Sequence, residues 1–171
     1  MLLRYAHRLG SEQVKTMQTP YLLEGLASGP SVVKTLVGRI DPQHYDTVVS
    51  PDSFTVREIV AHLADWEGIW RERAEHGQAQ GEGAVQPMDI DERAQSQNYA
   101  AWDVAESLAI YQQRREDFVE RVRQLTSEGM DRAYRHPVVG PMSAWVHCMM
   151  LAGHDLYHIQ QLLDYQAEFA R

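Results

Sequence analysis

The chain has 171 residues, of which 44% are hydrophobic, and a formal net charge of −8. These values predict a single globular domain with a sizeable core, and an acidic chain without a Lys/Arg cluster argues against nucleic acid or an anionic membrane as partner. The one cysteine, Cys148, excludes an intramolecular disulfide and a cysteine-rich zinc site. No apolar run approaches the roughly 20 residues of a membrane span. The start of the chain lacks the apolar stretch of a signal peptide, so we expect a cytoplasmic protein.

The first segment, residues 1–19, has no clean apolar period and is closed by Pro20. We expect it to form an N-terminal arm, with residues 20–171 as the folded domain. Such an arm is either a frayed terminus or a short helix packed on the domain or on a second subunit.

The first helix of the domain is predicted over residues 21–40, where apolar residues fall at spacings of three, four and seven. Thr19 is expected to be its N-cap, and Pro20 is a favoured first-turn residue. Gly29 and Pro30 interrupt the apolar pattern. A proline inside a helix removes a hydrogen bond and clashes with the preceding turn, so we expect a kink or a break there.

The second helix is predicted to follow a connection over residues 41–53. Ser53 or Thr55 is its expected N-cap, and Glu58 stands three residues after Thr55, which is a capping-box pattern. Its core-facing positions carry large apolar side chains: Ile59, Leu63, Trp66 and Trp70. His62 lies one step to the side of this stripe.

The segment 77–98 is long for a connection and is rich in Gly, Gln and acidic residues. Such loops are functional lids or flexible segments, and we expect a flexible one whose second half turns into a short helix. Asp103 is predicted to open the third long helix, with Gly129 as its stop. One heptad stripe holds its apolar residues: Val104, Leu108, Tyr111, Phe118, Val122 and Leu125. Arg115 takes a position in that stripe where an apolar residue is expected.

The last part of the chain is predicted to hold a turn or short hairpin over 135–143 and a helix from Ser143 to about Phe169. The four long amphipathic segments, with almost no alternating strand pattern, predict an all-α four-helix bundle. The long loop joins its second and third helices.

The last helix carries His154 and His158 four residues apart, which places both imidazoles on one face where they can ligate one metal ion. With 8 histidines in 171 residues, chance alone gives about 0.4 such pairs, so the spacing by itself is a weak signal. In a bundle His62 on the facing second helix is the natural third ligand. Three imidazoles leave coordination positions open, as in catalytic rather than structural sites. They suit zinc, nickel, iron or copper.

Two stretches, EIVAHLADWE at 58–67 and AGHDLYHIQQLLDY at 152–165, together resemble the DinB family, also called DinB/YfiT-like metal-dependent enzymes. The GPM turn at 140–142 also fits, and the resemblance covers roughly residues 20–168. It implies a four-helix bundle that holds a divalent metal with one histidine of the second helix and two of the last. On this sequence these ligands are His62, His154 and His158.

The resemblance implies a metal-dependent enzyme that acts on a small molecule, with zinc or nickel as the metal. The reaction it favours is thiol S-transfer, in which the metal would hold a low-molecular-weight thiol of the bacillithiol or mycothiol type as a thiolate. The alternatives are a hydrolase with a metal-bound water nucleophile and a non-catalytic stress-response binding module. Family resemblance also implies a possible homodimer.

Four further residues are candidates for the surroundings of the metal. Asp65 and Asp155 are possible acceptors that orient a ligand imidazole, although the position of Asp155 favours a salt bridge or solvent. Arg115 needs an anionic partner, for which an acid on another helix is favoured over a substrate carboxylate. His147 lies two turns before His154, too far to share the metal, and could line the pocket mouth.

Overall fold

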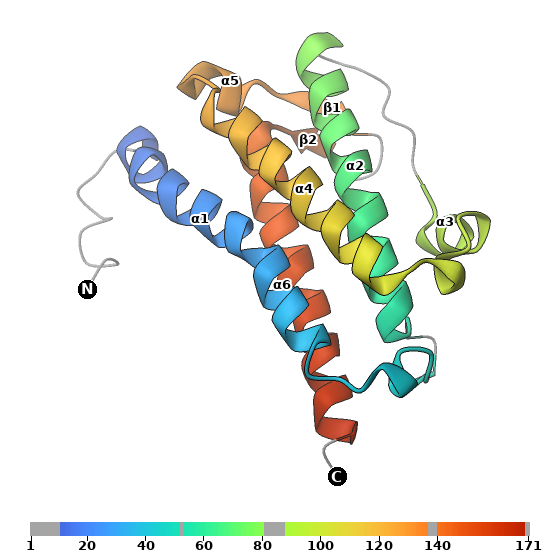
Figure 1. Ribbon diagram of the computed structural model, residues 1–171. Coiled ribbons are helices and arrows are strands. Elements are labelled where there is room, and N and C mark those ends of the chain that lie inside the picture. The colour runs from blue at the N-terminus through green and yellow to red at the C-terminus, as the bar shows by residue number, and fades with distance from the viewer. Residues whose placement is uncertain (1–10, 52, 81–87, 137–139, 170–171) are drawn as a thin grey trace.

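The computed structural model describes residues 11–51, 53–80, 88–136 and 140–169. Four long helices form a bundle, as predicted (Figure 1): α1 (Ser11–Val37), α2 (Val56–Gln80), α4 (Val104–Arg123) and α6 (Ala144–Phe169). Between them lie short elements: η3 (Pro42–His44), α3 (Ile90–Ser96), η4 (Tyr99–Ala101), α5 (Ser127–Asp131), β1 (Tyr134–His136) and β2 (Gly140–Met142). Within these ranges no helix combines the length and the apolar character needed to cross a membrane.

The helices α1 and α6 run in one direction along the bundle, and α2 and α4 run in the opposite direction (Figure 1). The principal packing is α2 on α4 and α1 on α6, and α1 also contacts α4. Because α2 and α4 are parallel neighbours, the chain must return along the bundle between them, which explains the long segment predicted at 77–98. The expected short helix in its second half is α3. Residues 81–87, on which the prediction of flexibility falls, lie outside the described residues.

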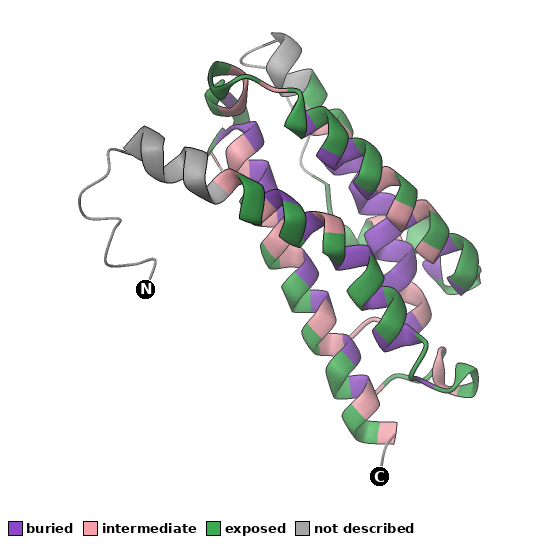
Figure 2. Cartoon of the chain, turned by 60° about the vertical axis from the view of Figure 1, so that its left-hand side comes forward, coloured by how far each residue is buried: buried purple, intermediate pink, exposed green. Residues whose placement is uncertain are grey.

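The predicted core stripes are confirmed. Figure 2 shows the buried residues gathered along the inward faces of the helices. In α2 the four predicted positions are all buried: Ile59, Leu63, Trp66 and Trp70. Of the six apolar residues predicted for the third helix, four are buried: Val104, Tyr111, Phe118 and Val122. The other two, Leu108 and Leu125, are half-buried.

The predicted starts of the second and third long helices are also confirmed. The backbone N–H of Thr55 donates to Glu58 Oε2 at 2.9 Å, and the N–H of Glu58 donates to Thr55 Oγ1 at 3.2 Å, which makes a reciprocal capping box for α2. Asp103 caps α4 by accepting from the N–H of Glu106 at 2.8 Å. The predicted hairpin is β1 paired antiparallel with β2, and α6 follows directly after Ser143.

The structure corrects the start of the predicted first helix and the end of the predicted third helix. α1 begins at Ser11, so Thr19 lies inside it and is not an N-cap. The described part of the expected arm is therefore helical, while residues 1–10 lie outside the described residues. Gly129 does not end the third helix, because α4 stops at Arg123 and Thr126 starts a separate α5 by accepting from the Gly129 N–H at 3.1 Å.

The helix α1 continues through Gly29 and Pro30 without a break, and its ribbon is bent between its two ends (Figure 1). Pro30 has no N–H, so the carbonyl of Leu26, four residues earlier, loses its usual helical donor. Nη1 of Arg115 donates to this carbonyl at 3.0 Å. A side chain from α4 thus supplies the hydrogen bond that the proline removes, and α1 continues through the site.

Gly29 is expected to resist substitution, because a Cβ at this position would lie 2.5 Å from Asp155 Oδ2 and 3.3 Å from Arg115 Nη1. Gly29→Ala should lower the free energy of unfolding by about 1–3 kcal/mol through overpacking. Gly25, in the same helix, is the matched control because a Cβ there meets nothing within 4 Å. Gly25→Ala should raise the free energy of unfolding by about 0.5–1 kcal/mol. Denaturant unfolding of both variants checks the prediction, and equal effects would contradict it.

Candidate metal centre

Three histidines meet between α2 and α6. Nε2 of His154 lies 2.9 Å from Nε2 of His62 and 3.2 Å from Nε2 of His158. One ligand atom from each of the three lies within 4.8 Å of the others. The structure therefore brings together the three residues that the sequence predicted as ligands.

The helices account for this convergence. His154 and His158 are one turn apart on α6, and their rings meet edge to face with centroids 4.6 Å apart. His62 projects from α2 beside the buried Leu63, and its ring centroid lies 5.0 Å from that of His154 and 4.9 Å from that of His158. His62 and His158 are buried and His154 is half-buried, so the cluster is closed on the core side.

The nitrogen spacings fit a metal ion. Two nitrogens that are each 2.0–2.1 Å from a tetrahedral ion lie about 3.3 Å apart, close to the 2.9 and 3.2 Å found between the Nε2 atoms. Hydrogen bonding among neutral imidazoles fits less well. Each Nε2 is either a donor or an acceptor, so the three atoms must share one proton or turn lone pairs toward one another. A single cation can accept all three lone pairs.

Gln161 determines which ring nitrogen of His158 carries the proton. Its Oε1 accepts a hydrogen bond from Nδ1 of His158 at 2.7 Å, so the Nδ1 nitrogen carries the proton and Nε2 is free to ligate. The sequence interpretation missed this residue, although its position three residues after His158 on the same helix could have indicated it. For His62, no hydrogen-bond partner of Nδ1 is found within the described part of the chain.

Burial keeps the three imidazoles neutral near pH 7. It lowers the pKa of His62 to about 2, and repulsion between its protonated form and the protonated forms of His158 and His154 acts in the same direction. Burial also lowers the pKa of His158 to about 4, and it lowers the pKa of His154. Metal ligation requires deprotonated imidazole nitrogen, so the site needs little proton release to bind a cation.

Asp65 does not orient a ligand imidazole, contrary to one of the predicted roles. Its oxygens accept hydrogen bonds from Nε and Nη2 of Arg93 at 2.7 and 2.8 Å and from the hydroxyl of Tyr99 at 2.7 Å. These bonds tie α2 to α3 and η4. Asp65 is linked to the site through Tyr99, which donates to it and whose ring centroid lies 6.1 Å from that of His62.

Arg115 has the acidic partners on other helices that the sequence favoured. Its guanidinium lies 2.7 Å from Glu67 Oε1 and 2.6 Å from Asp155 Oδ2, and all three side chains are buried. Tyr111 also donates to Asp155 at 2.7 Å. The salt bridge predicted for Asp155 is thus confirmed, while Glu67 was not predicted because nothing in the α2 pattern marks it as an ion-pair residue.

His147 packs beneath the β-hairpin and does not line an open pocket mouth. Only 1% of it is exposed, its ring lies against Trp70 and Tyr134, and its Nε2 is hydrogen-bonded to the Tyr134 hydroxyl. Burial lowers the pKa of His147 to about 4, helped by the positive charges of Arg73 and His136. The residue is therefore a neutral core histidine of the folded protein.

The buried His147 predicts a pH dependence of stability. An ordinary histidine has a pKa of 6.5, so between pH 6.5 and about 4 the unfolded chain binds a proton that folded His147 does not. The free energy of unfolding should fall as pH falls through this window, by about 1.4 kcal/mol per pH unit for this one proton. His147→Gln should make that slope shallower by up to the same amount. Denaturant unfolding with EDTA from pH 7 to 4 tests this, and an unchanged slope would contradict it.

A cavity of about 670 Å³ lies beside η4, and its described lining holds none of the three histidines. Its lining includes Phe54 and Tyr99, whose ring centroids lie 5.3 and 6.1 Å from that of His62. The rest of the lining is mostly polar and includes no Lys or Arg among the described residues: Val48, Ser53, Glu58, Asp91, Ala94, Gln95, Asn98 and Ala100. A small polar molecule can thus lie one aromatic ring away from a ligand imidazole.

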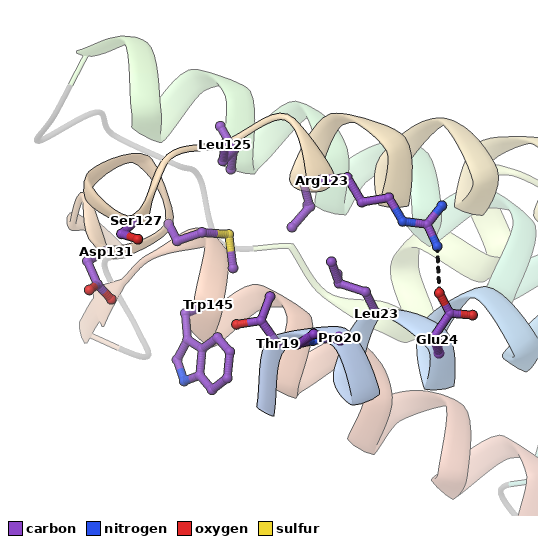
Figure 3. A pocket seen from close by; sticks show the side chains of 11 residues that line it. Thr19, Pro20, Leu23, Glu24, Arg123, Leu125, Ser127, Asp131 and Trp145 are labelled. Atoms are coloured by element: carbon purple, nitrogen blue, oxygen red, sulfur yellow. Dashed lines mark hydrogen bonds and ion pairs between the residues drawn. The ribbon is translucent and has the colours of Figure 1, made fainter. Parts of the chain in front are cut away.

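A second cavity, of about 390 Å³, lies at the other end of the bundle, where α4 ends and α6 begins. Figure 3 shows Leu23, Leu125 and Trp145 around it and Arg123 paired with Glu24 at its edge. Phe54 and Tyr99 of the first cavity contact the ring of His62, whereas no described lining residue of this second cavity is in ring contact with a ligand histidine. This cavity therefore has no part in the proposed chemistry.

Comparisons with known proteins agree with this geometry. A family model described as the DinB superfamily matches residues 26–162. A relative from Oceanobacillus iheyensis, named "Putative metal-dependent hydrolase", is 23% identical over 133 residues, which are 78% of this chain and 77% of the relative. YfiT from Bacillus subtilis, described as "a probable metal-dependent hydrolase with an unusual four-helix bundle topology", has a TM-score of 0.83 at 21% identity over 90% of this chain and 89% of its own. A DinB-like protein of the same organism has a TM-score of 0.51 at 18% identity over 88% and 93% of the two chains.

Proposed function

The chain belongs to the DinB superfamily, and on this premise we propose that it is a divalent-metal-dependent enzyme that hydrolyses a small substrate. The observation that carries the proposal is the approach of three neutral imidazoles: Nε2 of His154 lies 2.9 Å from Nε2 of His62 and 3.2 Å from Nε2 of His158. Three protein ligands leave at least one coordination position for water or substrate, as catalytic sites require. The named function of the relatives supports hydrolysis as the reaction.

Each part of the site has a role that its geometry allows. A divalent ion bound there supplies Lewis-acid activation of water or of a substrate carbonyl. His62, His154 and His158 hold it, and Gln161 keeps the ligating nitrogen of His158 free of a proton. Phe54 contacts the ring of His62, with centroids 5.3 Å apart, and also lines the cavity of about 670 Å³, which we propose as the place of the substrate.

Thiol S-transfer, the reaction that the family resemblance favoured, would use the same three histidines. We rank it second because low-molecular-weight thiols such as glutathione carry carboxylates, whereas the described lining of that cavity holds Glu58 and Asp91 and no Lys or Arg. The two reactions differ in the molecule that enters this cavity. Zinc or nickel as the metal, the cytoplasmic location and the homodimer stay predictions.

A reloading assay tests the proposal. Protein stripped with EDTA and reloaded with Zn²⁺ or Ni²⁺ should hydrolyse members of a panel of small esters, lactones and amides, including 4-nitrophenyl acetate. His158→Ala should abolish this turnover, whereas His44→Ala should retain it, because His44 stacks on Phe169 outside the site. Equal turnover by the stripped protein or by His158→Ala would contradict the proposal.

A parallel thermal shift with glutathione, bacillithiol and mycothiol separates the second reaction from the first. A thiol that binds the folded, metal-loaded protein raises its melting temperature. A clear rise without any ester or amide turnover would favour thiol transfer over hydrolysis.

A further inference from the structure

Arg115 is the point at which all four long helices of the bundle meet. Its guanidinium, on α4, bonds to Glu67 on α2, to Asp155 on α6 and to the carbonyl of Leu26 on α1. Both carboxylates are engaged twice: Glu67 at 2.7 and 2.8 Å, and Asp155 at 2.6 and 3.0 Å. Bidentate pairs of this kind fix the orientation as well as the distance of the two partners.

These acids stand on the two helices that carry the metal ligands. Asp155 directly follows His154 on α6, and Glu67 comes five residues after His62 on α2. The histidine cluster needs α2 and α6 in one relative position, because ligand atoms must be placed within about 0.5 Å for a metal site to form well. Arg115 links the acids of both helices through one rigid, planar group.

Two residues of the neighbouring helix α1 make room for the Arg115 guanidinium and its partners. Gly29 leaves the space that Asp155 Oδ2 occupies, and Pro30 removes the N–H that would otherwise bond to the Leu26 carbonyl, which Arg115 uses. Glycine and proline in the interior of a helix lower its stability. Their presence on the face toward this ion network therefore indicates that the network needs the space and the free carbonyl that they provide.

Stability alone does not account for such a network. Burying charges is costly, and well-packed apolar residues of similar volume are often as stabilising as a buried ion pair or more so. What the ion network adds is a defined geometry between the helices.

We propose that Glu67, Arg115 and Asp155 are positioning residues for the metal centre, which set the register of α2 against α6 and thereby the convergence of His62 with His154 and His158. This inference rests on the proposed function. It predicts that altering the network at Glu67, for which no contact with a ligand histidine is found among the described residues, lowers the affinity for the metal.

The test measures Co²⁺ binding to full-length protein by titration calorimetry and records the visible spectrum of the Co²⁺-loaded form. Three variants perturb the network in different ways. Glu67→Gln and Asp155→Asn each remove one charge with little change of shape, and Gly29→Ala displaces the Asp155 carboxylate without changing any charge. Asp46→Asn is the control, because Asp46 pairs with Arg57 at 2.6 and 3.0 Å on the surface, with 65% of its side chain exposed.

Each of the three variants should bind Co²⁺ at least about tenfold more weakly than the wild type and show an altered visible spectrum. Asp46→Asn should match the wild type in both. Circular dichroism at the assay temperature selects the variants that are folded, so that lost stability is not read as lost affinity. Wild-type affinity and spectrum in the folded variants would overturn the inference alone. A wild-type protein that binds no Co²⁺ would instead overturn the proposed function.

Discussion

Arg115→Met should lower the free energy of unfolding by about 3–5 kcal/mol, the loss typical of removing one partner from a buried ion pair. The substitution leaves Glu67 and Asp155 buried without their cation, and it removes the donor to the Leu26 carbonyl. Burial acts to lower the pKa of Arg115, but the hydrogen bonds that its guanidinium donates to both acids hold that pKa above its ordinary value, so the wild-type guanidinium is charged at every pH of the measurement. Urea unfolding at pH 7 measures the difference.

Two comparisons show that the loss comes from unpaired buried charge. Arg121→Met, in the same helix, removes an ion pair with Glu75 whose side chains are 62% and 45% exposed, and should cost at most about 1 kcal/mol. Adding Glu67→Gln and Asp155→Asn to Arg115→Met should recover part of the lost stability, because neutral amides cost less to bury than carboxylates. A loss in Arg115→Met no larger than that in Arg121→Met would contradict the account.

His154→Ala should abolish the stabilisation of the protein by zinc. Nε2 of His154 lies within 3.2 Å of both other ligand nitrogens, so this residue is the centre of the cluster. For the wild type, free Zn²⁺ at about 1,000 times its dissociation constant should raise the free energy of unfolding by about 4 kcal/mol. The variant lacks one of three ligands and should show no zinc-dependent change at the same concentration.

The matched control for this experiment is His44→Ala, which removes a histidine outside the site and should keep the full response to zinc. Urea unfolding of the wild type and of both variants, with and without Zn²⁺, gives the six values needed. An equal zinc-dependent rise in His154→Ala and in the wild type would place the metal elsewhere in the protein.

The sequence was sufficient to predict the bundle and the histidine cluster because both depend on local spacing. Amphipathic periods determine which faces of the helices are buried, and His154 and His158 share a face simply because they are four residues apart. His62 was found through its place beside a core stripe and through the family resemblance. The capping box of α2 and the β1–β2 hairpin also follow from interactions between residues close together in the sequence.

Contacts between distant segments explain what the sequence did not predict. A break at Gly29 and Pro30 was one of the expected outcomes, yet the helix continues because Arg115, 89 residues from Leu26, supplies a hydrogen bond that local rules cannot include. Glu67 has no local mark of its role, since its partner lies on another helix. Asp65 was assigned to the imidazoles because it lies near them on α2, but Arg93 and Tyr99 arrive from elements whose position depends on the whole fold.

The metal content of the purified protein is the most direct test of the account. Elemental analysis of wild type expressed in metal-supplemented medium should find one divalent ion per chain, and His62→Ala should contain far less. Because His62 is the ligand that the described part of α2 contributes, its loss separates a site built between two helices from a simple pair on α6. A wild type without stoichiometric divalent metal, or a His62→Ala variant with the same metal content as the wild type, would contradict the central claim.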